Sequence, residues 1–137
     1  MSLPDLNHAW FHIEDEDQIA SPALLLYRER IEHNLNLMIE IAGGAQRLRP
    51  HVKTHKLGPL VKRQIELGIT KYKCATIAEA EMTAAAGAPD VLLAMPCVGI
   101  NAHRYAELAL KYPATVFSTV ADRKVNIRLD FFFIRYD

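Results

Sequence analysis

The residues with the clearest chemical potential lie in one short run, Arg49-Pro50-His51-Val52-Lys53-Thr54-His55-Lys56. Its β-branched and basic residues predict the end of a strand that carries a lysine at its tip. A neutral lysine amine can form a Schiff base with a carbonyl cofactor, and a partly desolvated, electropositive pocket favours that neutral form. Lys53 is therefore our candidate for a catalytic, cofactor-binding lysine.

Alternation along this run indicates which side chains act together. In an extended chain, Arg49, His51 and Lys53 share one face of the strand. Leu48 and Val52 lie on the opposite face. Three polar side chains would then point together into a pocket or a barrel interior, which is unusual for a core. The alternative is a solvated loop with charged ends, which is the commoner setting for such residues.

Two further residues are candidates for contacts with a cofactor. His51 lies one layer beneath Lys53 on the same face, where it can bind or polarise a cofactor or serve as a hydrogen-bonded interior histidine. Thr76 ends the next predicted strand, at the edge where barrel enzymes keep their sites. Thr76 can also cap the following helix, with Glu79 three residues on completing a capping box. We favour the capping role, and the two roles of Thr76 are compatible.

Alternating strands and helices must position these residues. The apolar run at 23–27 predicts a first strand, and apolar residues at helical spacing from 31 to 42 predict a helix that ends at Gly43-Gly44. The alternation then repeats, which indicates βαβ units and a parallel sheet. The remaining strands are predicted at 48–53, 72–76, 91–94 and 115–118, and the helices at about 59–67, 78–86 and 102–111, the last with Asn101 as its N-cap.

Two architectures fit this alternation, an open doubly wound sheet or part of a (β/α)8 barrel. A dinucleotide-binding Rossmann fold would place a glycine-rich turn directly after its first strand. The glycine pair Gly43-Gly44 follows a helix instead, and no phosphate-binding P-loop sequence is present. The pattern therefore lacks the signatures of these two nucleotide-binding sites, and it leaves both architectures open.

Composition bounds the class of protein. The chain has 137 residues, with 16 basic against 16 acidic side chains, which suits one ordinary domain and argues against nucleic-acid or membrane-surface partners. Neither a secretory leader nor an apolar run long enough for a membrane span is recognisable, so we expect a cytoplasmic protein. Cys74 and Cys97 lie far apart and match no metal-ligand spacing, so we predict no metal site in this chain.

Four motifs together resemble a known family. They are Ser21-Pro22-Ala23-Leu24, the run from Arg49 to Lys56, Cys74-Ala75-Thr76-Ile77-Ala78-Glu79-Ala80-Glu81 and Asp90-Val91-Leu92-Leu93-Ala94. In this order they are similar to the N-terminal part of the D-threonine aldolase and D-serine dehydratase-like enzymes. The resemblance covers residues from about 21 to 122. It implies a partial (β/α)8 TIM-type barrel of the alanine racemase N-terminal kind, with about four βα units present.

The resemblance also implies a chemistry. Members of this family are pyridoxal phosphate enzymes, and their cofactor lysine maps onto Lys53, with His51 and Thr76 as further cofactor-binding candidates. The implied reaction is aldol cleavage of D-threonine or dehydration of D-serine, both lyase reactions on a small amino acid, and the motifs do not separate these from racemisation. A homodimer is implied as well, and so is a divalent metal in the full-length family, for which no ligand maps onto this chain. A single-barrel cofactor carrier fits the Lys53 run less well.

Length sets the expected domain organisation. We predict an N-terminal arm at 1–20, a partial barrel at 21–122 and an atypical aromatic tail at 123–137 that suggests a truncation or frameshift. A full barrel takes about 250 residues, so catalytic groups from the rest of the barrel mouth would be lacking. The alternative function is therefore a non-catalytic, truncated fragment with an incomplete barrel.

Overall fold

The computed structural model describes residue 11 and residues 13–120 of the chain. The predicted tail at 123–137 lies outside the described residues, as does half of the predicted arm at 1–20. The chain divides into two units, Met1–Met38 and Ile39–Asp137, and each is considered by itself below. The predicted domain boundaries at residues 20 and 122 stay predictions.

The first unit contains a 3-10 turn at Glu16–Gln18 and most of helix α1 (Arg28–Ala42). The helix predicted at 31–42 is confirmed, and it begins three residues earlier than expected. Its end is also as predicted, because Gly43 adopts a positive φ of 71° that glycine tolerates best. The strand predicted at 23–27 is wrong. Leu24 is 67% exposed, and no strand among the described residues pairs with this segment to supply the hydrogen bonds that a strand needs.

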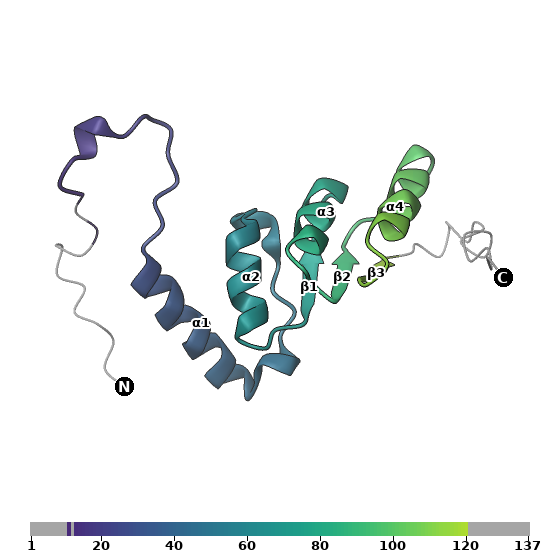
Figure 1. The fold of residues 1–137 in the computed structure, drawn as a ribbon, viewed down its shortest axis with the longest axis horizontal. Coiled ribbons are helices and arrows are strands. Elements are labelled where there is room, and N and C mark those ends of the chain that lie inside the picture. Colours follow the sequence, from purple (N-terminus) through teal and green to yellow (C-terminus); the bar gives the residue numbers. More distant parts are fainter. Residues whose placement is uncertain (1–10, 12, 121–137) are drawn as a thin grey trace. The chain divides into compact units, whose positions relative to one another are not determined.

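The second unit contains a parallel three-stranded sheet with helices between its strands (Figure 1). Helix α2 (Gly58–Glu66) precedes β1 (Lys71–Cys74), α3 (Ile77–Ala85) joins β1 to β2 (Asp90–Leu93), and α4 (Ile100–Lys111) joins β2 to β3 (Val116–Thr119). The strands follow one another in the order of the chain. This arrangement confirms the βαβ alternation and the partial barrel predicted from the sequence.

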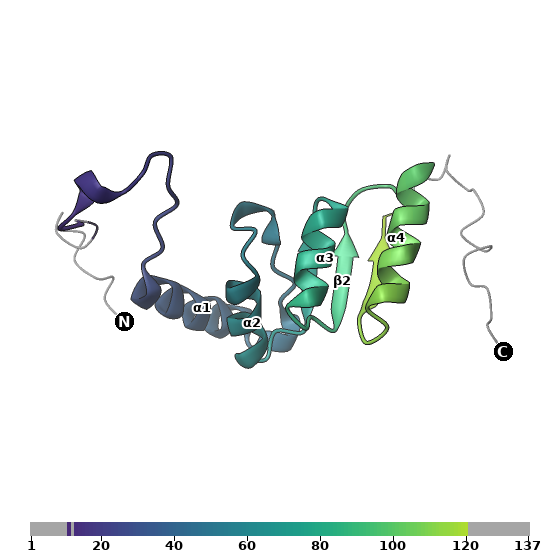
Figure 2. The same cartoon turned by 45° about the horizontal axis from the view of Figure 1, so that its top comes forward.

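Helices cover one face of this sheet. The side chains of β1 and β2 alternate between buried and half-exposed or exposed, which is the pattern of strands with one face in a core. The Tyr72 hydroxyl donates to the carbonyl oxygen of Ile69 (3.0 Å), and Tyr105 of α4 packs edge-on against Phe117 of β3 with ring centroids 5.6 Å apart. Figure 2 shows α3 and α4 lying along the strands. The largest fully buried side chains of this core are those of Val52, Val61, Ile69, Tyr72, Cys74, Thr83, Val91 and Leu93.

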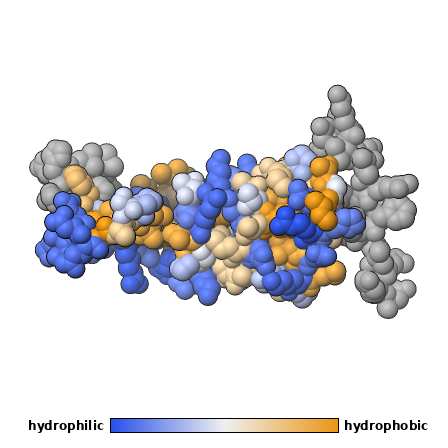
Figure 3. Space-filling view, turned by 90° about the horizontal axis from the view of Figure 1, so that it is seen from above, coloured by the Kyte–Doolittle hydropathy of each residue, from blue (hydrophilic) through white to orange (hydrophobic). Residues whose placement is uncertain are grey.

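The opposite face of the sheet carries more polar side chains. The register aligns Lys71 with Asp90 and Val116, and Lys73 with Leu92 and Ser118, so these residues share the face away from the helices. In a barrel this face is the interior. Val116 on this face is 67% exposed. Figure 3 shows apolar residues among hydrophilic ones on the surface seen in that view.

The strand predicted at 48–53 is reduced to a single parallel bridge between His51 and Lys73. The Lys73 backbone N–H donates to the carbonyl oxygen of Pro50 (2.9 Å), and the chain then enters a 3-10 turn at Val52–Thr54. Proline lacks the N–H that a longer ladder would use, which limits the pairing on this edge of the sheet.

The N-cap predicted for the last helix is also wrong. Asn101 lies inside α4, and Gly99 precedes the helix with φ 56° and ψ −133°, a conformation open essentially to glycine. The other predicted helices and strands are present, with ends shifted by one or two residues.

Candidate active site

The lysine singled out in the sequence lies in the turn directly after the His51 bridge. Lys53 is an exposed residue of this turn, so its side chain can reach a molecule at the end of the sheet. The bridge partner of His51 is Lys73 of β1, and two residues after Lys73 comes Ala75, which lies just beyond β1 and carries only a methyl group. Lys53 is therefore at the carboxyl end of the parallel strands, where barrel enzymes place their catalytic groups. Its cofactor role stays a prediction.

His51 is held beside Lys53 by a backbone contact. The Lys53 backbone N–H donates to Nδ1 of His51 (3.2 Å), so this nitrogen is unprotonated and acts as an acceptor. Burial lowers the pKa of His51, and the positive charges of Lys53 and Lys73 lower it further, while Glu79 opposes them. The imidazole is therefore neutral near pH 7, with its proton on Nε2. A neutral histidine here can donate a hydrogen bond but carries no charge of its own.

Thr76 has the capping role that the sequence favoured. Its hydroxyl oxygen accepts from the Glu79 backbone N–H (3.2 Å) at the start of α3. The Glu79 carboxylate returns to the backbone N–H of Ala75 (2.8 Å), one residue before the position that a standard capping box uses. Thr76 is exposed, which leaves its hydroxyl accessible for the second, cofactor-binding role that we predicted.

A buried carboxylate, that of Glu79, contacts Lys56 just after the turn that carries Lys53. The Glu79 side chain is 5% exposed, and its Oε1 atom is 3.4 Å from Nζ of Lys56, which is 63% exposed. Lys56 itself has a positive φ of 49°, a conformation that L-residues other than asparagine and aspartate seldom adopt. His55 lies between Lys53 and this ion pair in the sequence. Burial lowers the pKa of His55, and its buried Nε2 has no hydrogen-bond partner among the described residues.

Sequence reasoning missed an ion pair on the same face of the sheet. Arg49 donates to both carboxylate oxygens of Asp90 at 2.7 and 2.8 Å, and to the carbonyl oxygen of Tyr72 at 3.1 Å. Arg49 precedes the bridge beside β1 and Asp90 begins β2, so this contact reaches across β1. The hydrogen bond to Asp90 raises the pKa of Arg49. The sequence offered an arginine predicted to point inward and an aspartate that opens a later strand, but it did not show the register that brings the two together.

Because Arg49 is paired with Asp90, it is not a free cation at the site. Lys73 is a further positively charged residue there. Lys73 pairs with His51 in the bridge and lies on the same face, half-exposed. No carboxylate of the described residues forms an ion pair with Lys53 or Lys73. The end of the sheet therefore carries uncompensated positive charge, which attracts anions such as a phosphate group.

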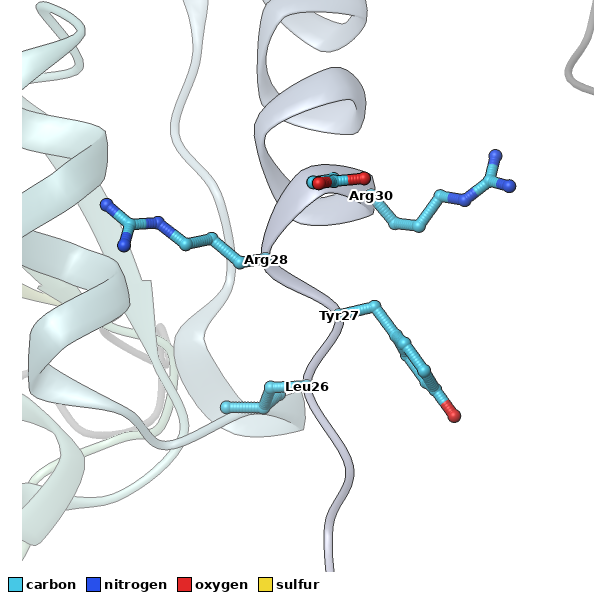
Figure 4. Close-up of a pocket in the computed structure, with 5 residues that line it drawn as sticks. Leu26, Tyr27, Arg28 and Arg30 are labelled. Atoms are coloured by element: carbon cyan, nitrogen blue, oxygen red, sulfur yellow. The ribbon is translucent and has the colours of Figure 1, made fainter. Parts of the chain in front are cut away.

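The first unit contains a surface pocket of about 390 Å³ lined by residues 26–30. Figure 4 shows that its labelled side chains diverge, with Arg28 and Arg30 extending in different directions. Five consecutive residues with diverging side chains do not make a set of convergent polar groups, so we assign no site there.

The part of the chain that the structure describes contains neither a metal-binding cluster nor a membrane-spanning helix. No three histidine, cysteine, aspartate or glutamate residues within residues 13–120 are grouped so that they could hold a metal ion. No helix in the same part of the chain is both long enough and apolar enough to cross a membrane.

Comparison with known proteins agrees with this geometry. The family described as "Alanine racemase, N-terminal domain" matches residues 27–122, which include every candidate residue above. The chain belongs to this family. It is also 36% identical over 76 residues to the D-threo-3-hydroxyaspartate dehydratase of Delftia sp. (strain HT23), a match that covers 55% of this chain and 20% of the dehydratase.

A solved structure confirms the fold of this family member. The chain is similar to the crystal structure of D-threonine aldolase from Filomicrobium marinum, with a TM-score of 0.65 and 34% identity over 75% of this chain and 28% of the aldolase. The resemblance to the D-threonine aldolase and D-serine dehydratase-like group is therefore confirmed. The chain spans about a fifth to a quarter of the length of these two relatives.

The described residues fit the cofactor of this family. Pyridoxal phosphate needs an accessible amine and a positively charged setting for its phosphate, and Lys53 with Lys73 supplies both. His51 accepts from the backbone N–H of Lys53, and burial lowers the pKa of His51, which favours its neutral form. A cofactor site formed by these residues stays a prediction.

Proposed function

We propose that this chain is part of a pyridoxal phosphate-dependent lyase in which Lys53 holds the cofactor as a Schiff base. The observation that carries the proposal is the position of Lys53, exposed in the turn directly after the His51–Lys73 bridge, inside the region matched by the family. The amine of Lys53 would hold the cofactor through its aldehyde carbon, with the aldehyde oxygen released as water. The cofactor, once bound, withdraws electrons from the amino acid.

The residues of this chain would orient that cofactor. His51 is fixed by the Lys53 backbone N–H and would present Nε2–H as a donor. The positive charge of Lys73 would favour an anionic group beside His51. The Thr76 hydroxyl, which caps α3, would lie at the same edge of the sheet. These three residues would bind and orient the cofactor, and none of them is assigned a proton transfer.

For the substrate we propose a D-amino acid with a hydroxyl group on its β-carbon. The support comes from the two relatives, whose names give D-threo-3-hydroxyaspartate and D-threonine as substrates. Both are D-configured β-hydroxy amino acids. Dehydration and aldol cleavage therefore remain the two proposed reactions, with D-serine and D-threonine as the substrates to test. A homodimer and a divalent metal held outside this chain stay proposals from the family, and a cytoplasmic location stays a proposal from the sequence.

The first experiment locates the covalent bond. Purified protein is incubated with pyridoxal phosphate, the Schiff base is reduced with borohydride, and the modified lysine is identified by peptide mass spectrometry. We expect the label on Lys53 and its loss in Lys53→Ala, whereas Lys62→Ala, which removes an exposed lysine of α2, keeps it. A label spread evenly over the surface lysines, unchanged in Lys53→Ala, would overturn the proposal.

A second candidate is a non-catalytic chain. The observation that favours it is the exposure of the site, since Lys53 and Thr76 are exposed and Val116 on the interior face is 67% exposed. Catalysis needs groups from several strands and the exclusion of water. A chain that carries the Lys53 label but releases neither pyruvate from D-serine nor glycine from D-threonine would favour this candidate.

A further inference from the structure

The turn that carries Lys53 leaves the sheet after a single bridge. Most of its own hydrogen bonds are internal, from the Lys53 backbone N–H to His51 Nδ1 and from the Lys56 backbone N–H to the Val52 carbonyl oxygen (2.8 Å). The fully buried Val52 side chain anchors its beginning. The remainder of the turn needs a separate anchor if Lys53 is to keep one position.

Glu79 provides that anchor from the next βα unit. One carboxylate oxygen accepts from the backbone N–H of Ala75 (2.8 Å), at the end of β1, and the other lies 3.4 Å from Lys56 Nζ. A single side chain therefore touches both the strand end and the turn. Because the carboxylate is 5% exposed, it depends on these two partners for the interactions that water would otherwise supply.

The backbone of Lys56 gives an independent indication of constraint. Its positive φ of 49° is unfavourable for a lysine, and glycine is the usual residue for such a conformation. A lysine at this position places an ammonium group over the buried carboxylate, which a glycine could not do. The contact with Glu79 therefore compensates for an unfavourable backbone at the end of the lysine turn.

We propose that Glu79 is a positioning residue, which fixes the turn around Lys53 by pairing with Lys56. This inference rests on the proposed function of Lys53. The carboxylate does not touch the cofactor and acts only through the turn. In its absence the turn would sample other positions, and fewer of them would present the Lys53 amine to the aldehyde.

The test compares variants by their dissociation constant for pyridoxal phosphate at Lys53, measured by reduction and mass spectrometry. Lys56→Met removes the exposed partner, and Glu79→Gln removes the charge while keeping an oxygen for the Ala75 N–H. We expect each to weaken the Lys53 adduct by about threefold to tenfold, as for the loss of one charge-assisted contact. Lys56→Arg keeps a positive charge at this position and should bind pyridoxal phosphate at Lys53 as tightly as the parent chain. Glu81→Gln, which breaks the exposed Glu81–Lys111 pair of the same helix, should leave this binding unchanged.

A second measurement does not depend on the cofactor. Hydrogen exchange of the backbone N–H groups at 52–57 should become faster in Lys56→Met and Glu79→Gln, and should return to the parent rate in Lys56→Arg. Unchanged exchange in both loss variants would overturn the anchor, and so would an equal change in Glu81→Gln. If the parent chain forms no adduct at Lys53 but the exchange changes as expected, the proposed function fails and the anchor stands. If the adduct forms and all variants bind alike, the positioning role fails alone.

Discussion

The ion pair between Arg49 and Asp90 provides the sharpest test of how the lysine segment is attached to the sheet. It joins residues 41 positions apart, reaches across β1 and uses both carboxylate oxygens at 2.7 and 2.8 Å. The two side chains are 30% and 28% exposed. Their burial places them between exposed pairs, which contribute at most about 1 kcal/mol, and buried pairs, whose disruption costs about 3–5 kcal/mol.

We expect Asp90→Asn to lower the free energy of unfolding by about 2 kcal/mol, because the substitution keeps the shape of the side chain but removes its charge. Arg49→Met should have a similar effect. In the double variant Arg49→Met/Asp90→Asn the two losses should not add, with a coupling energy of about 1–2 kcal/mol. Urea denaturation followed by circular dichroism measures all four proteins.

Lys111→Met serves as the matched control, since it breaks a 2.6 Å pair whose side chains are 61% and 45% exposed. Its loss should stay below about 1 kcal/mol and should shrink in high salt, whereas the Arg49–Asp90 coupling should persist there. If Lys111→Met costs as much unfolding free energy as Asp90→Asn, or if the coupling between Arg49 and Asp90 vanishes in salt, the reasoning about burial and attachment is refuted.

Three further outcomes follow from the structure. Burial lowers the folded-state pKa of His51 and His55, so the unfolded chain binds more protons and stability should fall as the pH drops below about 6.5, the ordinary histidine pKa. His51→Gln and His55→Gln should flatten this dependence in urea titrations at pH 5 to 8. A parent curve with no such fall would contradict the assignment. Burial raises the pKa of Cys74 to about 11, so a thiol reagent should modify the half-exposed Cys97 quickly and Cys74 only on unfolding; two equally fast thiols would mean that Cys74 is not in the core. Thr76→Ala should cost about 1 kcal/mol of unfolding free energy by removing the cap of α3, with Thr76→Ser as the control that keeps the hydroxyl.

The elements of the second unit could be predicted from sequence because local signals agree there. Gly68 and Gly87 follow the ends of α2 and α3 with positive φ, and Thr76 with Glu79 marks the start of α3. Buried apolar residues alternate along β1 and β2 as expected for strands with one covered face. Each of these signals depends only on a residue and its immediate neighbours in the chain, so a single sequence is enough to recognise it.

The errors arose where pairing or backbone geometry decided the outcome. The apolar run at 23–27 looks like a strand by composition, but a strand exists only through its partner, and the sequence does not show which partner is present. The run before Lys53 was shortened to a bridge by Pro50 and by the turn that His51 supports. At α4, the unusual backbone of Gly99 took the place expected for Asn101.

The candidate site was predicted only in part for a similar reason. The position of Lys53 and the cap at Thr76 follow from motif and spacing. The contacts of Glu79 with Lys56 and of Arg49 with Asp90 join separate βα units, and their recognition requires the register of the sheet. Sequence reasoning therefore located the chemical group but not the side chains that hold it in place.

The strand order also determines the order in which the strands can pair while the chain is being synthesised. Each strand pairs with the next one along the chain, so the sheet can grow unit by unit as the polypeptide leaves the ribosome. Arg49 has no carboxylate to meet until Asp90, 41 residues later, has emerged and β2 has docked on β1. We therefore expect the Arg49 end of the lysine segment, although synthesised earlier, to become fixed only after β2 has docked on β1.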